Sequence, residues 1–186
     1  MFPMKTERLV IREYKKKDIS ELCRVFSQPQ VYATTCGIPK RCNSFWGEWW
    51  IGAVHLNARQ HTAWEFGVFL RDSERYIGNI GIINVDLQHK KGDITYIIDS
   101  ELWNNGYATE AAQRILAFGF NRLKLKRIGG TCMTVNKASR RVMEKIGLRY
   151  EGTARCSLYK DGIFYDIDNL SILDNEFFTN SNIPKI

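Results

Sequence analysis

A small, amide-rich turn is the part of this chain with the clearest chemical meaning. It lies in residues 102–112, Leu-Trp-Asn-Asn-Gly-Tyr-Ala-Thr-Glu-Ala-Ala, between a strand-like run and a run with apolar side chains at helical spacing. The first turn of a helix leaves unpaired N–H groups and the positive end of the helix dipole. Because Gly106 and Ala108 add little bulk, this turn could hold an anionic diphosphate against the backbone without a cationic side chain.

The glycine pattern of this turn is not specific by itself. No Lys-Ser or Lys-Thr follows a glycine run, and three spaced glycines are missing, so neither the mononucleotide nor the dinucleotide motif is present. A turn in which Gly106 only relieves backbone strain is the alternative. The function therefore depends on what accompanies the turn.

The segment that follows the turn and its helix contains two further predicted elements. Residues 127–135 predict a strand, and residues 136–148, Asn-Lys-Ala-Ser-Arg-Arg-Val-Met-Glu-Lys-Ile-Gly-Leu, predict a short helix. Asn136 is a good N-cap and Gly147 a typical helix stop.

Together these two segments resemble the GNAT N-acetyltransferases, and within them the branch of ribosomal-protein N-terminal acetyltransferases (RimJ/RimL-like). The opening Thr-Glu-Arg-Leu-Val-Ile-Arg at residues 6–12 and Gly-Leu-Arg-Tyr-Glu-Gly at residues 147–152 are similar to that branch. The chain departs from the family pattern at Trp103, where Gln or Arg is frequent, and at Asn104, where a second glycine is frequent. Trp103 leaves the backbone amides in place, and Asn104 slightly restricts the backbone.

The resemblance implies one α+β domain over residues 1–186 with the GNAT fold. This fold has a central mixed, mostly antiparallel, twisted sheet of about seven strands flanked by about four helices. The family pattern covers about residues 6–174, so residues 175–186 are expected to form a C-terminal tail.

The resemblance also implies an enzyme that transfers acetyl directly from acetyl-CoA, as co-substrate, to a primary amine. The favoured acceptor is a protein N-terminal α-amine, with the N-terminus of a ribosomal protein as one candidate. One alternative is the same chemistry on a small amine, such as an aminoglycoside or a polyamine. Another is a non-catalytic protein that binds acyl-CoA together with RNA or a ribosomal partner.

Three groups of coenzyme-binding residues follow from the resemblance. They are the backbone of Ile97, Ile98 and Asp99 for the pantetheine arm, the amides of Asn104, Asn105, Gly106, Tyr107, Ala108 and Thr109 for the diphosphate, and the side chains of Asn136 and Arg141. The role of Asn136 as a helix cap is compatible with this one. Basic residues are also expected around the coenzyme end, where phosphates need counter-charge: Lys124, Lys126, Arg127, Lys137, Arg140, Arg141 and Lys145.

The catalytic candidates that the resemblance implies are Ser139 and Asp93. Ser139 would hydrogen-bond the departing thiolate, with first-turn capping as its alternative role. Asp93 would act as a base through water, with a solvated turn aspartate as the alternative; Glu65 and Asp166 are reserves. An α-amine with a pKa near ~8 is about a tenth neutral at pH 7, whereas a lysine amine near ~10.4 is far less so. A weak, water-linked carboxylate therefore suits an α-amine better.

The acceptor region is expected around a helix that Asn43 or Ser44 caps. It carries Trp46, Trp49 and Trp50, and the resemblance places the corresponding helix beside the acceptor slot. Packing in the core is the alternative for these three tryptophans.

The remaining elements must hold these groups in place. A strand is expected at residues 9–13, a helix of about ten residues from Asp18 until Pro29 ends it, and a less regular region at residues 31–59. Strands are predicted at residues 62–70, 76–85 and 93–99 as an antiparallel meander. Residues 150–158 and 164–173 predict a hairpin with Lys160-Asp161-Gly162 as its turn, followed by a frayed tail from residue 177.

Composition agrees with one globular domain: 186 residues, 44% hydrophobic and 25% charged. The chain contains neither an apolar run of about 18 residues nor a signal-peptide core, so it is expected in the cytoplasm and off the membrane. Five scattered cysteines without a CxxC pair argue against a disulfide framework and against a metal site. The net charge of +7 allows nucleic-acid binding, but no recognised module supports a specific nucleic acid. A homodimer is left open.

Overall fold

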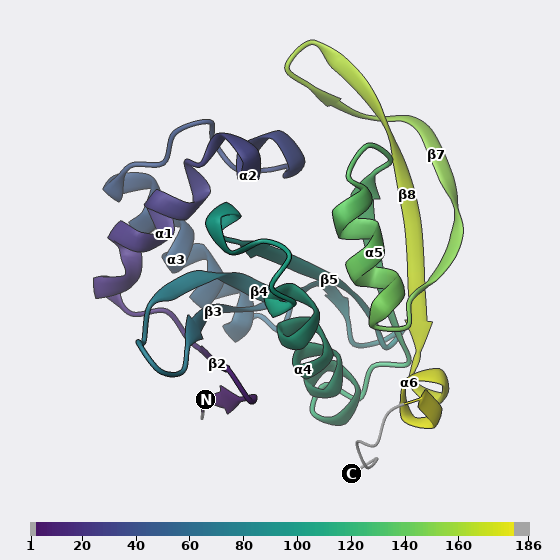
Figure 1. The fold of residues 1–186 in the computed structure, drawn as a ribbon. Helices are drawn as coiled ribbons and strands as arrows, with labels where there is room; N and C mark the ends of the chain where they lie inside the picture. The colour runs from purple at the N-terminus through teal and green to yellow at the C-terminus, as the bar shows by residue number, and fades with distance from the viewer. Residues whose placement is uncertain (1–2, 181–186) are drawn as a thin grey trace.

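The computed structural model describes residues 3–180, which form one eight-stranded sheet with helices on both faces (Figure 1). The strand order is β1-β2-β3-β4-β5-β6-β8-β7, and all neighbours are antiparallel except β5 and β6. The strands are β1 Met4–Lys5, β2 Leu9–Arg12, β3 Trp64–Leu70, β4 Tyr76–Asp86, β5 Lys91–Ile98, β6 Arg127–Met133, β7 Arg149–Lys160 and β8 Ile163–Leu173.

The helices confirm the α+β class. They are α1 Ile19–Phe26, α2 Pro29–Thr34, α3 Ser44–Arg59, α4 Tyr107–Asn121, α5 Lys137–Lys145 and α6 Asp174–Asn180, with short 3-10 turns at Lys16–Asp18 and Ser100–Leu102. The mixed, mostly antiparallel sheet is as predicted, although residues 3–180 contain eight strands and six α-helices rather than about seven and four.

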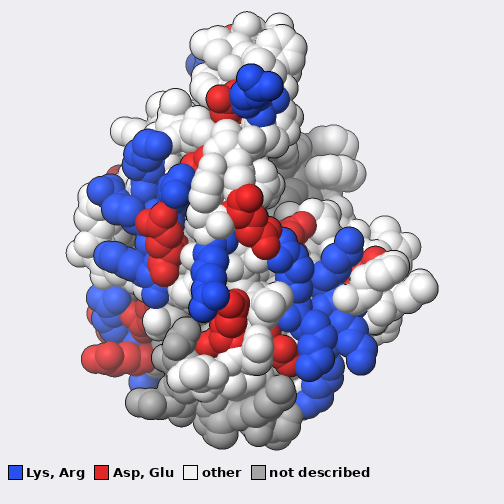
Figure 2. Space-filling view, turned by 90° about the vertical axis from the view of Figure 1, so that its right-hand side faces the viewer, with Lys and Arg blue, Asp and Glu red and all other residues white. Residues whose placement is uncertain are grey.

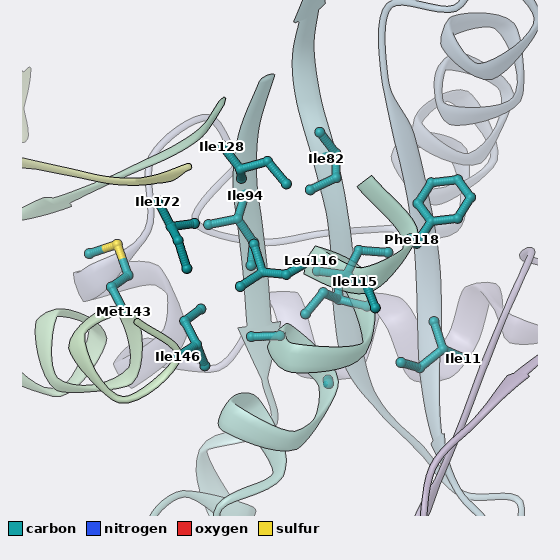
Figure 3. Packing of buried hydrophobic residues seen from close by; sticks show 14 of the residues in the cluster. Ile11, Ile82, Ile94, Ile115, Leu116, Phe118, Ile128, Met143, Ile146 and Ile172 are labelled. Atoms are coloured by element: carbon teal, nitrogen blue, oxygen red, sulfur yellow. The ribbon is translucent and has the colours of Figure 1, made fainter. Parts of the chain in front are cut away.

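Each face of the sheet has its own apolar cluster. On one face, α4 buries Ile115, Leu116 and Phe118 against strand residues such as Ile82 and Ile94 (Figure 3). On the other face, α1 and α3 cover a smaller cluster, in which Ile97 of β5 takes part. Successive residues of a strand point to opposite faces, so Ile94 and Tyr96 face α4 whereas Ile97 faces α1 and α3.

The two parallel strands pair over only a short length. Residues 91–93 of β5 are in register with residues 127–129 of β6. Beyond them, β5 continues to Ile98 and β6 to Met133 without pairing to each other. The outer edge of β5 is therefore unpaired from about residue 94 onward, and this edge opens toward the first turns of α4 and α5.

Two segments differ from the prediction. Pro29 ends α1 as expected, but it also starts α2, because a proline at the first helical position has its φ already set and needs no amide partner. The tail predicted to fray from residue 177 is instead helical to residue 180, since Phe177 is 4% exposed and packs 5.2 Å from Phe120. Residues 181–186 lie outside the described part.

The C-terminal hairpin extends past the rest of the sheet, and its tip bends toward α2 (Figure 1). Asp161 and Gly162 have φ values of +49° and +84°, which are typical of the tight turn that joins two antiparallel strands. The predicted turn is thus confirmed. The hairpin tip contacts α2 through Lys160 and Asp161.

Candidate functional site

The turn before α4 leaves its backbone amides without protein partners. Asn104 and Gly106 have φ values of +64° and +80°, a left-handed conformation that Asn and Gly adopt most easily. Within residues 3–180, the amides of residues 104–109 donate to no protein acceptor, and the first such bond is from Glu110 N to Gly106 O, 3.0 Å. Unpaired amides at a helix N-terminus attract an anion.

Side chains hold this turn in shape. Trp103 Nε1 donates to Ile98 O over 2.7 Å, and Asn105 Nδ2 donates to the carbonyls of Leu102 and Trp103 over 3.1 Å each. The tryptophan that departs from the resembled pattern therefore ties the turn to the end of β5.

Arg8 places a cation beside the same turn. Its Nε donates to Glu110 Oε2 over 2.7 Å, its Nη1 donates to Asn105 O over 3.0 Å, and its guanidinium lies 4.5 Å from the Tyr107 ring centre. A Cβ built on Gly106 would lie 3.4 Å from Arg8 Nη2. Sequence reasoning missed Arg8 as a site residue, because only the fold brings it to a turn almost a hundred residues away.

Asp99 anchors the end of β5. Its carboxylate has no exposed surface and accepts from Arg24 Nη2, Arg75 Nη2 and Gln28 Nε2 at 2.8, 3.0 and 2.8 Å. Burial alone would raise the pKa of this carboxyl, but the hydrogen bonds from Gln28 and Arg24 outweigh it and lower the pKa. The Asp99 amide donates to Ile77 O over 2.7 Å, so it cannot pair with a pantetheine arm as predicted.

The register of β4 against β5 determines which backbone groups of β5 face the gap between β5 and β6. Ile97 is paired with Asn79, and like Asp99 it directs its backbone toward β4, because pairing groups alternate along an antiparallel strand. Tyr96 and Ile98 consequently direct theirs toward the unpaired edge, although the Ile98 carbonyl already accepts from Trp103. Of the three predicted residues, Ile98 alone faces the gap, and Tyr96 was missed.

Ser139 and Tyr96 connect α5 with β5. Asn136 Oδ1 accepts from Ser139 N over 3.0 Å, which confirms Asn136 as the cap of α5. Tyr96 Oη donates to Ser139 O over 3.0 Å and lies 2.9 Å from Ser139 Oγ. Burial raises the pKa of Tyr96 to about 12, so its hydroxyl is neutral at physiological pH. The predicted serine therefore has a fixed hydroxyl neighbour at the open edge of β5.

Asp93 lies elsewhere on β5. It is half-buried where β5 still pairs with β6, its Oδ2 accepts from Asn84 Nδ2 over 3.0 Å, and its Oδ1 lies against Gly129. Asp93 and Tyr96 are three residues apart and so face opposite sides of the sheet. The structure therefore does not bring Asp93 and Ser139 together.

The two reserve carboxylates differ in their surroundings. Asp166 Oδ1 accepts from Cys156 N over 2.8 Å where β7 bulges, which gives it a structural role in the hairpin. Glu65 accepts from Asn79 Nδ2 over 3.0 Å, and burial raises its pKa to about 7.

The three tryptophans of α3 differ in exposure. Trp46 and Trp50 stack at 6.1 Å and pack on Phe26, so they belong to the cluster between α1 and α3. Trp49 is 62% exposed. Trp46 and Trp50 thus take the core-packing role that was the alternative, at least in part, and substrate binding by the three tryptophans stays a prediction.

The end of α2 is fastened on both sides. Asn136 Nδ2 of α5 donates to Thr34 O over 3.4 Å. On the hairpin side, Lys160 Nζ donates to the carbonyls of Tyr32 and Thr35, the latter over 2.8 Å, and Tyr32 Oη donates to Asp161 Oδ1 over 2.9 Å. We call the contacts of Tyr32 and Thr35 with Lys160 and Asp161 the α2 clasp. Together with the contact from Asn136, the clasp holds the end of α2 between the start of α5 and the hairpin tip.

The basic residues do not all gather at the coenzyme end as predicted. Lys126 and Arg127 follow the C-terminal end of α4, about 22 Å from its first turn, and pair with Asp174 and Glu151 at 2.6 and 2.5 Å. Arg140 pairs with Asp168 and Glu144, while Arg141 is exposed on α5. On the hairpin side of the molecule, basic and acidic side chains are interspersed (Figure 2).

Other classes of site find little support in residues 3–180. That part of the chain holds no group of three or more His, Cys, Asp or Glu side chains arranged for a metal ion. None of its helices combines the length and apolarity needed to cross a bilayer. What the geometry offers is an anion site, an unpaired strand edge, a positioned hydroxyl and carboxylates on the opposite sheet face.

Related sequences and structures cover nearly the whole chain. Residues 8–149 match the model of the acetyltransferase (GNAT) domain family. The uncharacterized N-acetyltransferase YnaD of Bacillus subtilis is 35% identical over 172 residues, covering 92% of this chain and 97% of YnaD. The crystal structure of a GNAT-family acetyltransferase from Bacillus anthracis is 30% identical, with a TM-score of 0.81 and coverage of 94% of this chain and 100% of the other.

A more distant structure shares the fold alone. RimL, the ribosomal L7/L12 alpha-N-protein acetyltransferase in complex with coenzyme A, superposes with a TM-score of 0.85 at 14% identity, covering 92% of this chain and 98% of that one.

Proposed function

This chain belongs to the GNAT acetyltransferases, and on that premise we propose that it transfers acetyl from acetyl-CoA to the α-amine at the N-terminus of a protein. The single observation that carries the proposal is the set of unengaged amides at residues 104–109 beside the unpaired edge of β5. A diphosphate at those amides would direct the attached pantetheine arm along β5.

Residues of this chain can hold each part of the coenzyme. The amides of residues 104–109 and the guanidinium of Arg8 would bind the diphosphate, and Arg141 is our candidate for the remaining phosphate. The backbone of Tyr96 and Ile98 would pair with the pantetheine arm as a neighbouring strand does. Acetyl-CoA supplies the acetyl group as an activated thioester.

Ser139 and Asp93 are the proposed catalytic residues. Ser139 would donate its hydroxyl proton in a hydrogen bond to the departing sulfur, while its Oγ accepts from Tyr96 Oη, which holds the serine in place. A thiol with a pKa near ~8.5 needs only modest help, so a neutral hydroxyl suffices. Asp93 would accept a proton through water on the sheet face that α1 and α3 cover.

The choice of an α-amine rests on acid strength and on a fold neighbour. An α-amine has a pKa near ~8, so a weakly basic site can deprotonate it at neutral pH. RimL acetylates a ribosomal protein at its α-amine. We therefore propose a protein N-terminus, such as that of a ribosomal protein, as the acceptor class. The enzyme would work in the cytoplasm, and a homodimer remains a prediction that light scattering can test.

A thiol-release assay tests the proposal. Acetyl-CoA is supplied with a peptide carrying a free α-amine, with the same peptide blocked at its N-terminus but carrying a lysine, and with spermidine and an aminoglycoside. Thiol release with the first peptide alone supports the proposal. Release with the small amines supports the alternative acceptor class, and a coenzyme-stabilised melting temperature without turnover supports a non-catalytic binder.

A further inference from the structure

A row of three residues crosses the sheet on the face that α1 and α3 cover. Glu65 of β3 is in register with Gly81 of β4, and Gly81 is in register with Thr95 of β5. A Cβ built on Gly81 would lie 2.5 Å from Trp64 O and 2.7 Å from Glu65 Cγ, so the Glu65 side chain passes close over Gly81. A side chain at position 81 would clash with β3 and displace Glu65.

The carboxylate in this row lacks the partners that a buried charge requires. Asn79 Nδ2 donates to Glu65 Oε2 over 3.0 Å, and within residues 3–180 no ion pair is formed by Glu65. Asn79 is 2% exposed, and its Oδ1 has no hydrogen-bond partner in the described part of the chain. Buried polar atoms are nearly always satisfied. Among residues 3–180, Asn79 Oδ1 lacks a donor, and the adjacent Glu65 carboxylate has one neutral donor, Asn79 Nδ2. Together they indicate a ligand that brings N–H groups.

We propose that Glu65 binds the ammonium group of the acceptor and takes its proton, with Asn79 holding the carboxylate and Gly81 leaving room for the Glu65 side chain. This inference rests on the acetyl transfer proposed above and names the group that receives the first proton. It adds Glu65 as the residue that takes the proton directly from the ammonium group, beside Ser139 at the sulfur, whereas Asp93, which acts through water, would pass that proton on to solvent.

The proton balance is simple. One N–H bond of the ammonium breaks and an O–H bond forms on Glu65, which leaves the nitrogen with a lone pair for attack on the thioester carbonyl. The C–N bond then forms and the C–S bond breaks, and the second proton lost by nitrogen goes to the departing sulfur beside Ser139. Glu65 returns its proton to solvent. The net reaction converts an ammonium ion and a thioester into an amide, a thiol and a proton.

Acid strength then favours α-amines. Burial raises the pKa of Glu65 to about 7. Proton transfer from an α-amine with a pKa near ~8 is only about tenfold unfavourable, whereas transfer from a lysine amine near ~10.4 is more than 10³-fold unfavourable. The site therefore discriminates between two primary amines by their basicity.

Several neighbouring groups could affect this titration. The titratable and charged side chains on the elements around Glu65 include Arg12 of β2, Tyr14 of the following loop, His55 of α3, Tyr76 of β4 and Asp93 of β5. Arg12 is paired with Asp18. The Tyr14 and Tyr76 hydroxyls stay neutral, since burial raises the pKa of each. Asn79 is thus the main polar partner of Glu65.

The test measures kcat/KM against pH for a peptide with a free α-amine. In the wild type, the profile should rise through a limb near pH 7. Glu65→Gln should lower kcat/KM at pH 7 by about 10²-fold and leave the affinity for acetyl-CoA unchanged. The rise of kcat/KM with pH should then follow the pKa of the free amine, near ~8. Asn79→Ala should move the limb to higher pH, because the hydrogen bond from Asn79 lowers the pKa of Glu65. Glu48→Gln, on the exposed surface of α3, should change nothing.

Two results would overturn the inference: a limb near pH 7 that persists in Glu65→Gln, or a limb that disappears in Asp93→Asn but not in Glu65→Gln. If Glu65→Gln fails to bind acetyl-CoA or melts early, Glu65→Asp keeps the test valid, because a retained carboxylate should retain the limb. A wild type without thiol release on any amine would refute the proposed function instead.

Discussion

Tyr96 Oη lies 2.9 Å from Ser139 Oγ, and it joins the open edge of β5 to the first turn of α5. The proposed role of Ser139 at the departing sulfur requires that its hydroxyl be held in one orientation. The phenol supplies that constraint from a strand, which is more rigid than a loop.

Removing the serine hydroxyl should slow the chemical step. Ser139→Ala is expected to lower kcat about 10²-fold while the affinity for acetyl-CoA stays the same. Tyr96→Phe should lower kcat less, by about fivefold, because the serine remains but is less fixed. Steady-state kinetics with a peptide acceptor measure both effects, and Ser157→Ala on the exposed hairpin serves as control. Unchanged turnover in Ser139→Ala with coenzyme bound normally would contradict the assignment.

A methyl group at the N-cap of α4 should disturb coenzyme binding. Gly106→Ala adds a Cβ where φ is +80°, which costs about 1–2 kcal/mol of strain and places bulk where a diphosphate would lie. Calorimetry should show a Kd for CoA raised five- to tenfold. Gly162→Ala has a comparable φ of +84° with no atom within 4 Å of the new Cβ. It should lose stability similarly but keep its CoA affinity; equal losses of affinity would argue against an anion site at the turn.

Acetyl donors with and without a diphosphate can show whether Arg8 binds the coenzyme or only supports the turn. Arg8→Ala should raise KM for acetyl-CoA about tenfold, and Arg8→Lys should recover only part of it, since lysine lacks the forked donor geometry. Neither change should affect acetyl-pantetheine, which has no diphosphate. An equal effect on both donors would mean that Arg8 only braces the turn through Glu110.

Asp99 should contribute stability that depends on pH. Its pKa is lowered in the fold, so its contribution is present above the unfolded pKa near ~3.9 and is lost as the pH falls through the lowered folded value. Asp99→Asn should reduce the free energy of unfolding at pH 7 by about 3 kcal/mol, because Arg24 and Arg75 lose their buried partner.

Urea unfolding measures this effect at pH 7 and pH 3. The wild type should lose more stability than Asp99→Asn between these pH values. Glu101→Gln removes a 65% exposed partner of Arg75 and should have little effect. A variant with the same acid sensitivity as the wild type would show that Asp99 does not supply it.

Local signals explain what could be predicted from the sequence. Asn43 and Asn136 cap α3 and α5 as predicted, because a cap depends on residues three positions apart. The hairpin turn at Asp161 and Gly162 was likewise readable from turn chemistry. Membership of the family followed from the turn before α4 together with α5, and the family match confirms it.

The features that were missed all depend on distant pairs. Arg8 reaches the turn across the fold, and Tyr96 rather than Ile97 faces the gap because of the register of β4 against β5. A register shift of one residue would turn the backbone of Ile97 toward the gap and that of Tyr96 away from it. The burial of Trp46 and Trp50 likewise depends on where α1 packs, which the periodicity of α3 alone does not specify.

The α2 clasp has a consequence for the order in which the protein folds during synthesis. It ties residues 32 and 35, made early, to residues 160 and 161, made late. During synthesis the meander of β2 to β5 can pair among its own neighbours, whereas the α2 clasp can form only when the last quarter of the chain has been made. The end of α2 therefore gains these contacts only after the hairpin has emerged.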